Sequence, residues 1–282
     1  MSARDQLLVV IDPVARRTDG ESVRIARDVL GAGAAVRVCL PDGPEEFVRA
    51  LEKRGGRRPV VVGDDRALLR AVGVLHRERE LAGCALAMVP VGGTAALGLA
   101  RSLGVPQGAV AAARAVLEGT ERRLDLLVDD RDGVVLGDLR IPPAPAAAPA
   151  PVGPGVAVEG AGWLRTCQSF VRTLAARPSR VAAGPGPESP RLRVEADGVT
   201  LVDLDEAVEG VRVSTAPEGG FARVEVRASS VGAEAAPVRV RARTITVSGA
   251  DFRYRADALV GGPVRTRTWT VRPSAWGLTL PR

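Results

Sequence analysis

The first 130 residues alternate short apolar runs with amphipathic stretches. Leu7–Ile11, Pro59–Gly63 and Ala85–Pro90 are apolar throughout, and Ala35–Leu40 is a further strand candidate. Strands of this kind are buried on both faces, which is typical of a parallel sheet covered by helices. The expected helices are Glu21–Leu30 (closed by Gly31), Pro44–Arg54, Asp64–Leu75, Val91–Leu103 and Gln107–Leu117, and Leu124–Val128 is expected as the strand that leaves this layer. We therefore predict an α/β fold with a doubly wound, mostly parallel sheet.

From Arg191 onward the hydrophobic period changes to two. Segments such as LRVEADGVTLVDL, ARVEVRA and TRTWTVR alternate apolar and polar residues between turn signals. This pattern predicts an antiparallel β-sandwich with one solvated face. Arg239, Arg241 and Arg243 share a face, which either meets anionic lipid headgroups or is an ordinary solvated strand face.

A proline-rich segment separates the two patterns. Pro142–Gly155 reads PPAPAAAPAPVGPG, and repeated prolines remove backbone donors and fix φ, so it is expected to be a linker or long loop. Gly162–Ala176 has an apolar face compatible with a helix. The predicted domains are an α/β nucleotide-binding-like domain at 1–130 and a β-sandwich domain at 131–282.

Composition excludes several classes of protein. The 282 residues are 46% hydrophobic but only 3% aromatic, so the cores must be built from Val, Leu and Ala. A net charge of +6 argues only for non-specific attraction, so no specific nucleic-acid partner is inferred. Cys39, Cys84 and Cys167 are scattered and odd in number, which favours reduced thiols in a cytoplasmic protein. With His76 as the single histidine, a Cys/His zinc site is not expected.

Two glycine-containing turns follow the third and fourth apolar strands. The first reads Gly63-Asp64-Asp65-Arg66-Ala67 and the second reads Pro90-Val91-Gly92-Gly93-Thr94. Ligands of parallel sheets sit at the carboxyl ends of the strands, where these turns fall. Gly92 and Gly93 permit close backbone approach to an anion, and Thr94 is expected to cap the next helix.

The order of these pieces resembles the diacylglycerol kinase and sphingosine kinase family of lipid kinases. In that family a strand leads into Gly-Gly-Asp-Gly-Thr, and a later strand leads into Pro-x-Gly-Thr-x-Asn and a helix ending in Ala-Arg-x-Leu-Gly. Here the matching pieces are the two turns, the stretch Leu99–Gly104 and the exit segment VLEGTERRLDLL. The resemblance covers residues 6 to 130 and implies an ATP-dependent kinase that uses Mg²⁺.

The resemblance implies a nucleotide site with altered residues. Gly63, Asp65, Arg66, Gly92, Gly93 and Thr94 would contact the nucleotide, and Asp65 with Asp64 would hold Mg²⁺. Asp64 replaces a family glycine, Arg66 and Ala67 replace the remaining Gly-Thr, and the chain contains no asparagine. The alternative interpretation is an acidic loop that no longer binds nucleotide, because close carboxylates repel phosphate unless a cation is present.

A weaker match returns near the C-terminus. Asp257 falls on the aspartate of the family's Asp-Gly-Glu segment, whereas Ala258 and Leu259 replace the Gly and Glu. By resemblance Asp257 would be the general base that accepts the proton of a lipid hydroxyl. The alternative is an aspartate with a purely structural role in a turn.

Two hypotheses from different classes remain at this point. The first is an ATP-dependent lipid kinase, with a lipid substrate or an anionic membrane surface as partner. The second is a non-catalytic pseudokinase that binds a lipid, a nucleotide or a protein. In both, the protein is expected to be cytoplasmic, with peripheral contact to the inner membrane surface as one option. The sequence does not indicate an oligomeric state.

Overall fold

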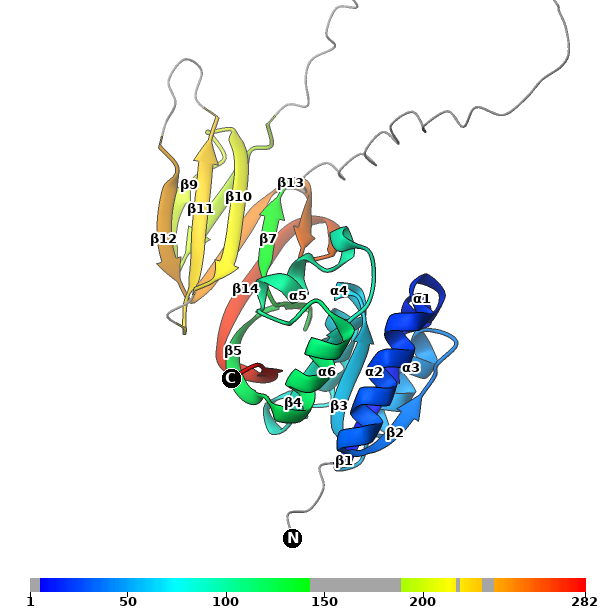
Figure 1. Ribbon diagram of the computed structural model, residues 1–282. Helices are drawn as coiled ribbons and strands as arrows, with labels where there is room; N and C mark the ends of the chain where they lie inside the picture. The colour runs from blue at the N-terminus through cyan, green and yellow to red at the C-terminus, as the bar shows by residue number, and fades with distance from the viewer. Residues whose placement is uncertain (1–5, 143–188, 217–218, 230–235) are drawn as a thin grey trace, which may run out of the picture.

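The computed structural model describes residues 6–142, 189–216, 219–229 and 236–282. The predicted linker beyond Pro142 and the predicted helix at Gly162–Ala176 therefore lie outside the described residues. The N-terminal half contains four parallel strands in the order β2–β1–β3–β4 (Figure 1). Their bounds are β1 Gln6–Ile11, β2 Ala35–Cys39, β3 Arg58–Gly63 and β4 Ala85–Pro90.

Helices cover both faces of this parallel layer, which confirms the doubly wound arrangement. On β1, Leu7 and Val9 pack into one core, while Leu8 and Val10 pack into the other. All four side chains are buried, which explains why the strand is apolar at every position. The helices are α1 Pro13–Thr18, α2 Gly20–Gly33, α3 Pro44–Glu52, α4 Asp65–Arg77, α5 Gly98–Ser102 and α6 Ala109–Glu118.

Of the predicted helices, one is longer in the structure and another is not continuous. Helix α2 continues through Gly31 and ends at Gly33, because the N–H of Ala34 donates to the carbonyl of Leu30 and closes the last turn there. The helix predicted over Val91–Leu103 is wrong. A 3₁₀ turn at Thr94–Ala96 is followed by the short helix α5, so the backbone is irregular where a continuous helix was expected.

The C-terminal half is antiparallel, as the alternating pattern predicts. Alternate valines and leucines of these strands fill a separate core around Tyr254 and Trp269. Strands β8 and β9 contact β12 and β11, which gives the two layers of a sandwich. The strands are β5 Thr120–Asp129, β6 Val134–Val135, β7 Asp138–Ile141, β8 Leu192–Ala196, β9 Val199–Val202, β10 Val208–Thr215, β11 Ala222–Ala228, β12 Val238–Ala242, β13 Thr244–Ala256 and β14 Leu259–Leu280.

The long strand β14 joins the two halves. Its first part pairs with β13, and its last part pairs with both β5 and β4, where Leu278 lies opposite Leu86. Trp276 and Leu278 are fully buried in the core under α3 and α4. The predicted domain boundary at residue 130 stays a prediction. The C-terminal end of β14 belongs to the predicted second domain by sequence, yet it pairs with β4 of the parallel layer.

Among the helices of the described ranges, none combines the length and the apolar character needed to span a membrane.

Candidate functional site

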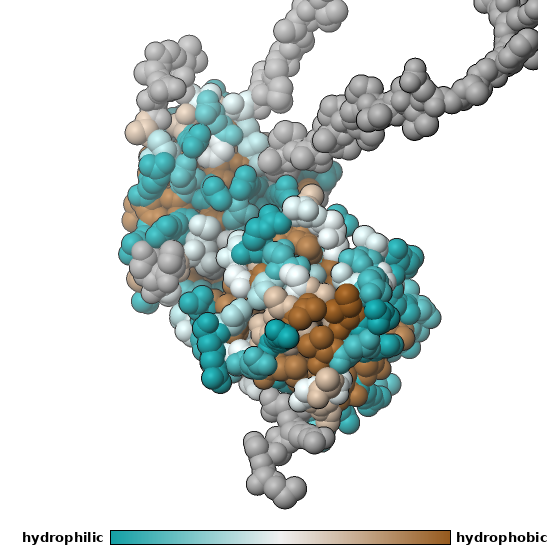
Figure 2. Space-filling view, in the orientation of Figure 1, coloured by the Kyte–Doolittle hydropathy of each residue, from teal (hydrophilic) through white to brown (hydrophobic). Residues whose placement is uncertain are grey.

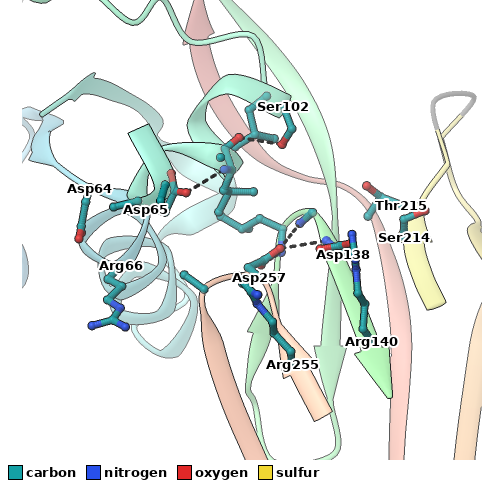
Figure 3. Close-up of a pocket in the computed structure, with 18 of the residues that line it drawn as sticks. Asp64, Asp65, Arg66, Ser102, Asp138, Arg140, Ser214, Thr215, Arg255 and Asp257 are labelled. Atoms are coloured by element: carbon teal, nitrogen blue, oxygen red, sulfur yellow. Dashed lines mark hydrogen bonds and ion pairs between the residues drawn. The ribbon is translucent and has the colours of Figure 1, made fainter. Parts of the chain in front are cut away.

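A cavity of about 820 Å³ lies where the α/β half meets the antiparallel half. One wall is the start of α4 with the segment around α5, and the other consists of β7, β10 and the end of β13. Figure 3 shows Asp64 and Asp65 on the first side and Arg140, Arg255 and Asp257 toward the second. The cavity therefore has an acidic wall and a wall rich in arginine.

The first turn uses carboxylates to satisfy backbone donors. Asp64 is the N-cap of α4, and its Oδ1 accepts the N–H of Ala67 at 3.0 Å. At the end of β1, Asp12 likewise caps α1, and its other oxygen accepts from Arg70 at 2.8 Å. A side chain at Gly63 would come within 3.0 Å of Cβ of Asp12, so this glycine is needed for packing between the turns. Free N–H groups at helix starts bind anions, and here the protein's own carboxylates accept from them.

Asp65 connects the two turns. Its Oδ2 accepts the N–H of Leu99 at 2.8 Å, and its Oδ1 accepts the N–H of Ala100 at 2.9 Å. The side chain is buried, and this burial raises the pKa of the Asp65 carboxyl, although the two N–H donors lower it in part. Asp65 thus serves as the acceptor for two amides in the first turn of α5.

The second turn does not form the predicted capped helix. Thr94 is exposed and begins the 3₁₀ turn, whose N-cap is Gly93 and has no side-chain hydrogen bond. The prediction that Thr94 caps the following helix is therefore wrong. Gly92 packs beside the first turn, since a Cβ there would lie 3.5 Å from Cβ of Asp64, while Gly93 borders open space.

Asp257 lies in the turn between β13 and β14, with a positive φ of 50°. Its carboxylate accepts three backbone N–H groups, from Leu136 at 2.7 Å, Gly137 at 2.8 Å and Asp138 at 2.9 Å. Burial raises the pKa of Asp257 to about 6, even though these donors favour the ionised form. Since a carboxylate has about four acceptor positions, little capacity is left for a substrate hydroxyl.

Four of the predicted site residues line the cavity, and four do not. Asp64, Asp65, Arg66 and Asp257 border it, although the side chain of Arg66 extends away from Asp257 (Figure 3). The predicted contacts that lie outside the lining are Gly63, Gly92, Gly93 and Thr94. The binding and catalytic roles assigned to all eight residues stay predictions, because lining a cavity shows where a residue lies and not what it binds.

Sequence reasoning missed the arginines of the opposite wall. Arg140 and Arg212 both contact Asp138, at 2.8 Å and 3.3 Å, and Arg255 donates to the carbonyl of Asp257 at 2.9 Å. The alternating pattern indicates that these residues face solvent, but it gives no sign that β7 lies between β10 and β13.

The carboxylates around the first turn do not fit a magnesium site well. Both oxygens of Asp65 accept backbone N–H groups, and one oxygen of Asp64 does the same. Mg²⁺ needs oxygen ligands that can complete an octahedron. Within the described ranges, no group of three or more His, Cys, Asp or Glu side chains is arranged to hold a metal ion.

Neither a family model nor a curated protein matches the sequence. Solved structures do match over nearly the whole chain. A "putative diacylglycerol kinase" from Bacillus anthracis str. Sterne is 13% identical with a TM-score of 0.70, covering 99% of this chain and 98% of that one. A second structure described as a "putative diacylglycerol kinase" from the same organism is 13% identical, with a TM-score of 0.67 and coverage of 99% of both chains. A third, described as a diacylglycerol kinase from that organism, is 14% identical, with a TM-score of 0.66 and coverage of 99% of this chain and 98% of that one. The chain therefore has the diacylglycerol kinase fold, as the resemblance implied.

Proposed function

We propose that this diacylglycerol-kinase-like protein binds a phosphate-bearing ligand in the cleft between its two halves and does not transfer a phosphoryl group. The observation that supports this most directly is the use of Asp12, Asp64 and Asp65 as acceptors for backbone N–H groups in the first turns of α1, α4 and α5. In a working kinase such donors would neutralise the triphosphate.

Electrostatics support the same proposal. The carboxylates of Asp64 and Asp65 at the first turn repel a triphosphate, whereas the charge of Asp12 is compensated by its ion pair with Arg70 at 2.8 Å. The first turn contributes Arg66 as its only cation, and its side chain extends away from Asp257. Binding of ATP with Mg²⁺ would therefore be weak at the position that the family resemblance implies.

The opposite wall has the chemistry for a phosphate. Arg140, Arg212 and Arg255 are exposed and line the cavity. Guanidinium groups bind phosphate oxygens through paired N–H donors, and a single Asp138 shared by two arginines leaves donors available. A lipid phosphomonoester has this chemistry, and the lipid-kinase fold makes it the first ligand to test.

One observation favours catalysis as a second candidate function. Asp257 borders the same cavity as Asp65, and its pKa of about 6 lies in the range useful for a general base. In this alternative, Asp257 accepts the proton of a lipid hydroxyl, and the predicted ATP and Mg²⁺ bind at the first turn. The hydrogen bonds from Leu136, Gly137 and Asp138 argue against it, because they occupy most acceptor positions of the carboxylate.

Binding and transfer assays on the full chain separate the two functions. Calorimetric titration should show binding of phosphatidate in detergent micelles, weaker binding of diacylglycerol, and no transfer of label from Mg·ATP to diacylglycerol. Arg140→Gln should weaken phosphatidate binding about tenfold, the usual effect of losing a hydrogen bond to a charged group. Arg253→Gln is the matched control, because Arg253 is exposed on β13 outside the cavity lining. If the wild type transferred label from Mg·ATP to diacylglycerol and Asp257→Asn abolished that transfer, the proposal would be overturned in favour of a lipid kinase.

A further inference from the structure

A row of charged residues crosses five strands of the antiparallel half. Arg255 of β13 lies opposite Arg140 of β7, and Arg140 lies opposite Arg212 of β10. Arg212 then lies opposite Glu225 of β11, which lies opposite Arg239 of β12. Because directly paired residues point to the same side of a sheet, these five side chains form one line, which we call the arginine row.

The arginine row faces solvent. Its neighbours along each strand point the other way into the core, as Leu139, Val213 and Val224 do. The four arginines are exposed, and Glu225 is half-buried between them. In Figure 2, hydrophilic residues cover much of the surface over β10, β11 and β12. Because the side chains of the four arginines lie outside the core, core packing does not explain why these positions are arginine.

Positive charge is in excess along the arginine row. Glu225 contacts Arg239 at 3.1 Å and Arg227 at 3.2 Å, and these guanidinium groups lower the pKa of its carboxyl. Asp138 is shared in the same way between Arg140 and Arg212. Each carboxylate thus serves two guanidinium groups. Like charges opposite one another destabilise a sheet, so this arrangement has a cost that a bound anion would offset.

The arginine row begins in the proposed binding cleft. A second groove, of about 600 Å³, lies over β10, β11 and β12, and it shares Arg212 and Ser214 with the cavity between the two halves. With strands about 4.8 Å apart, the four steps from Arg255 to Arg239 span roughly 19 Å. A ligand that starts in the cleft can therefore continue across the sheet to its edge.

We propose that the cleft and the arginine row form one site for a ligand with several phosphate groups in succession. This inference rests on the proposed phosphate binding in the cleft. It further states that the ligand is long enough to leave the cleft and that it runs across the strands of the sheet. No residue of the row is aromatic, so it lacks the stacking platform of single-stranded nucleic-acid sites. The row also lacks the apolar side chains with which a membrane-bound surface enters the acyl region.

Titration of the full chain with inorganic phosphates of increasing length tests the inference. Tripolyphosphate should bind about tenfold more tightly than orthophosphate, and medium-chain polyphosphate more tightly still. Arg239→Gln should weaken binding of medium-chain polyphosphate several-fold and leave orthophosphate unchanged, because only a long chain reaches β12. Arg265→Gln is the matched control, since Arg265 forms an exposed pair with Asp251 at the same 3.1 Å distance outside the row.

Three results would overturn the inference. Equal affinity for orthophosphate and polyphosphate would show that the arginine row does not take part in binding. If Arg140→Gln still weakened the binding of orthophosphate, the proposed function would stand without the further inference. Equal losses in Arg239→Gln and Arg265→Gln would show non-specific attraction to a basic protein. Binding of phosphatidylglycerol vesicles that depends on Arg239, without binding of polyphosphate, would identify the row as a membrane contact instead.

Discussion

The carboxylate of Asp257 accepts the backbone N–H of Gly137 at 2.8 Å, a contact between residues 120 positions apart in the chain. The same carboxylate also accepts the N–H groups of Leu136 and Asp138. These three hydrogen bonds hold the turn between β6 and β7 beside the start of β14. This contact shapes the floor of the cleft, and it ties the exit from the α/β half to the last hairpin.

The pH dependence of stability should reveal the burial of Asp257. Its pKa is raised from 3.8 to about 6, so the folded state binds more protons than the unfolded state within that window. Stability contributed by this group is therefore complete below pH 3.8 and is lost as the pH rises through 6. The free energy of unfolding of the wild type relative to Asp257→Asn should fall across the window, by about 3 kcal/mol at most. Urea titrations at several pH values measure it, and a constant difference would contradict the prediction.

Gly137 should tolerate no side chain. A Cβ at this position would lie 2.9 Å from Oδ1 of Asp257 and 2.9 Å from Cδ1 of Leu99. Gly137→Ala should lower the free energy of unfolding by about 1–3 kcal/mol, the usual cost of overpacking. Gly93→Ala is the control, because nothing lies within 4 Å of its Cβ position. Equal melting temperatures for the two variants would show that the turn can shift at little cost.

Removal of the Asp65 carboxylate should destabilise the junction between the two turns. Asp65→Ala leaves the N–H groups of Leu99 and Ala100 without their acceptor in a buried site, which costs on the order of 2 kcal/mol or more. Asp65→Asn keeps one acceptor oxygen and should lose less. Urea denaturation without metal gives both values. If Asp65 served chiefly as a metal ligand, the two variants would differ from wild type only when Mg²⁺ is present.

Replacement of Asp64 and Arg66 by glycine should bring back nucleotide binding if the carboxylates are what prevents it. Asp64→Gly removes one carboxylate and frees the N–H of Ala67. Arg66→Gly removes one positive charge at the same time, so the net charge is unchanged and the expected gain comes from the freed donor. The loss of the cap costs only a few tenths of a kcal/mol, because glycine is tolerated at this position. Millimolar Mg·ATP should raise the melting temperature of this variant more than that of the wild type. An unchanged response would show that the altered residues are not the main obstacle.

Much of the fold could be predicted because positions that are buried in the structure are apolar in the sequence. The runs at Pro59–Gly63 and Ala85–Pro90 are apolar throughout because helices cover both faces of β3 and β4. The period of two after Arg191 indicates strands with one solvated face, and these strands form the sandwich. Asp65 and Asp257 could be singled out by resemblance, and both line the cleft.

The backbone after β4 could not be predicted from the pattern of side chains. Residues Val91–Leu103 have the composition of a helix, yet the regular helix begins only at Gly98. Asp65 accepts the N–H groups of Leu99 and Ala100, so a residue 34 positions earlier holds the start of α5. Such a contact depends on how two turns meet in space, and local propensity carries no information about it.

The sequence by itself determined the parallel strands that are buried on both faces, most of the helices, and the alternation of buried and exposed residues in the antiparallel half. Only the tertiary structure decided that β7 lies between β10 and β13, and this order places Arg140 beside both Arg212 and Arg255. The physical reason is that the alternation of side chains fixes a strand's face but not its neighbour. Strand order depends on pairing between distant segments and on their shared core, so the arginine row exists only once the chain has folded.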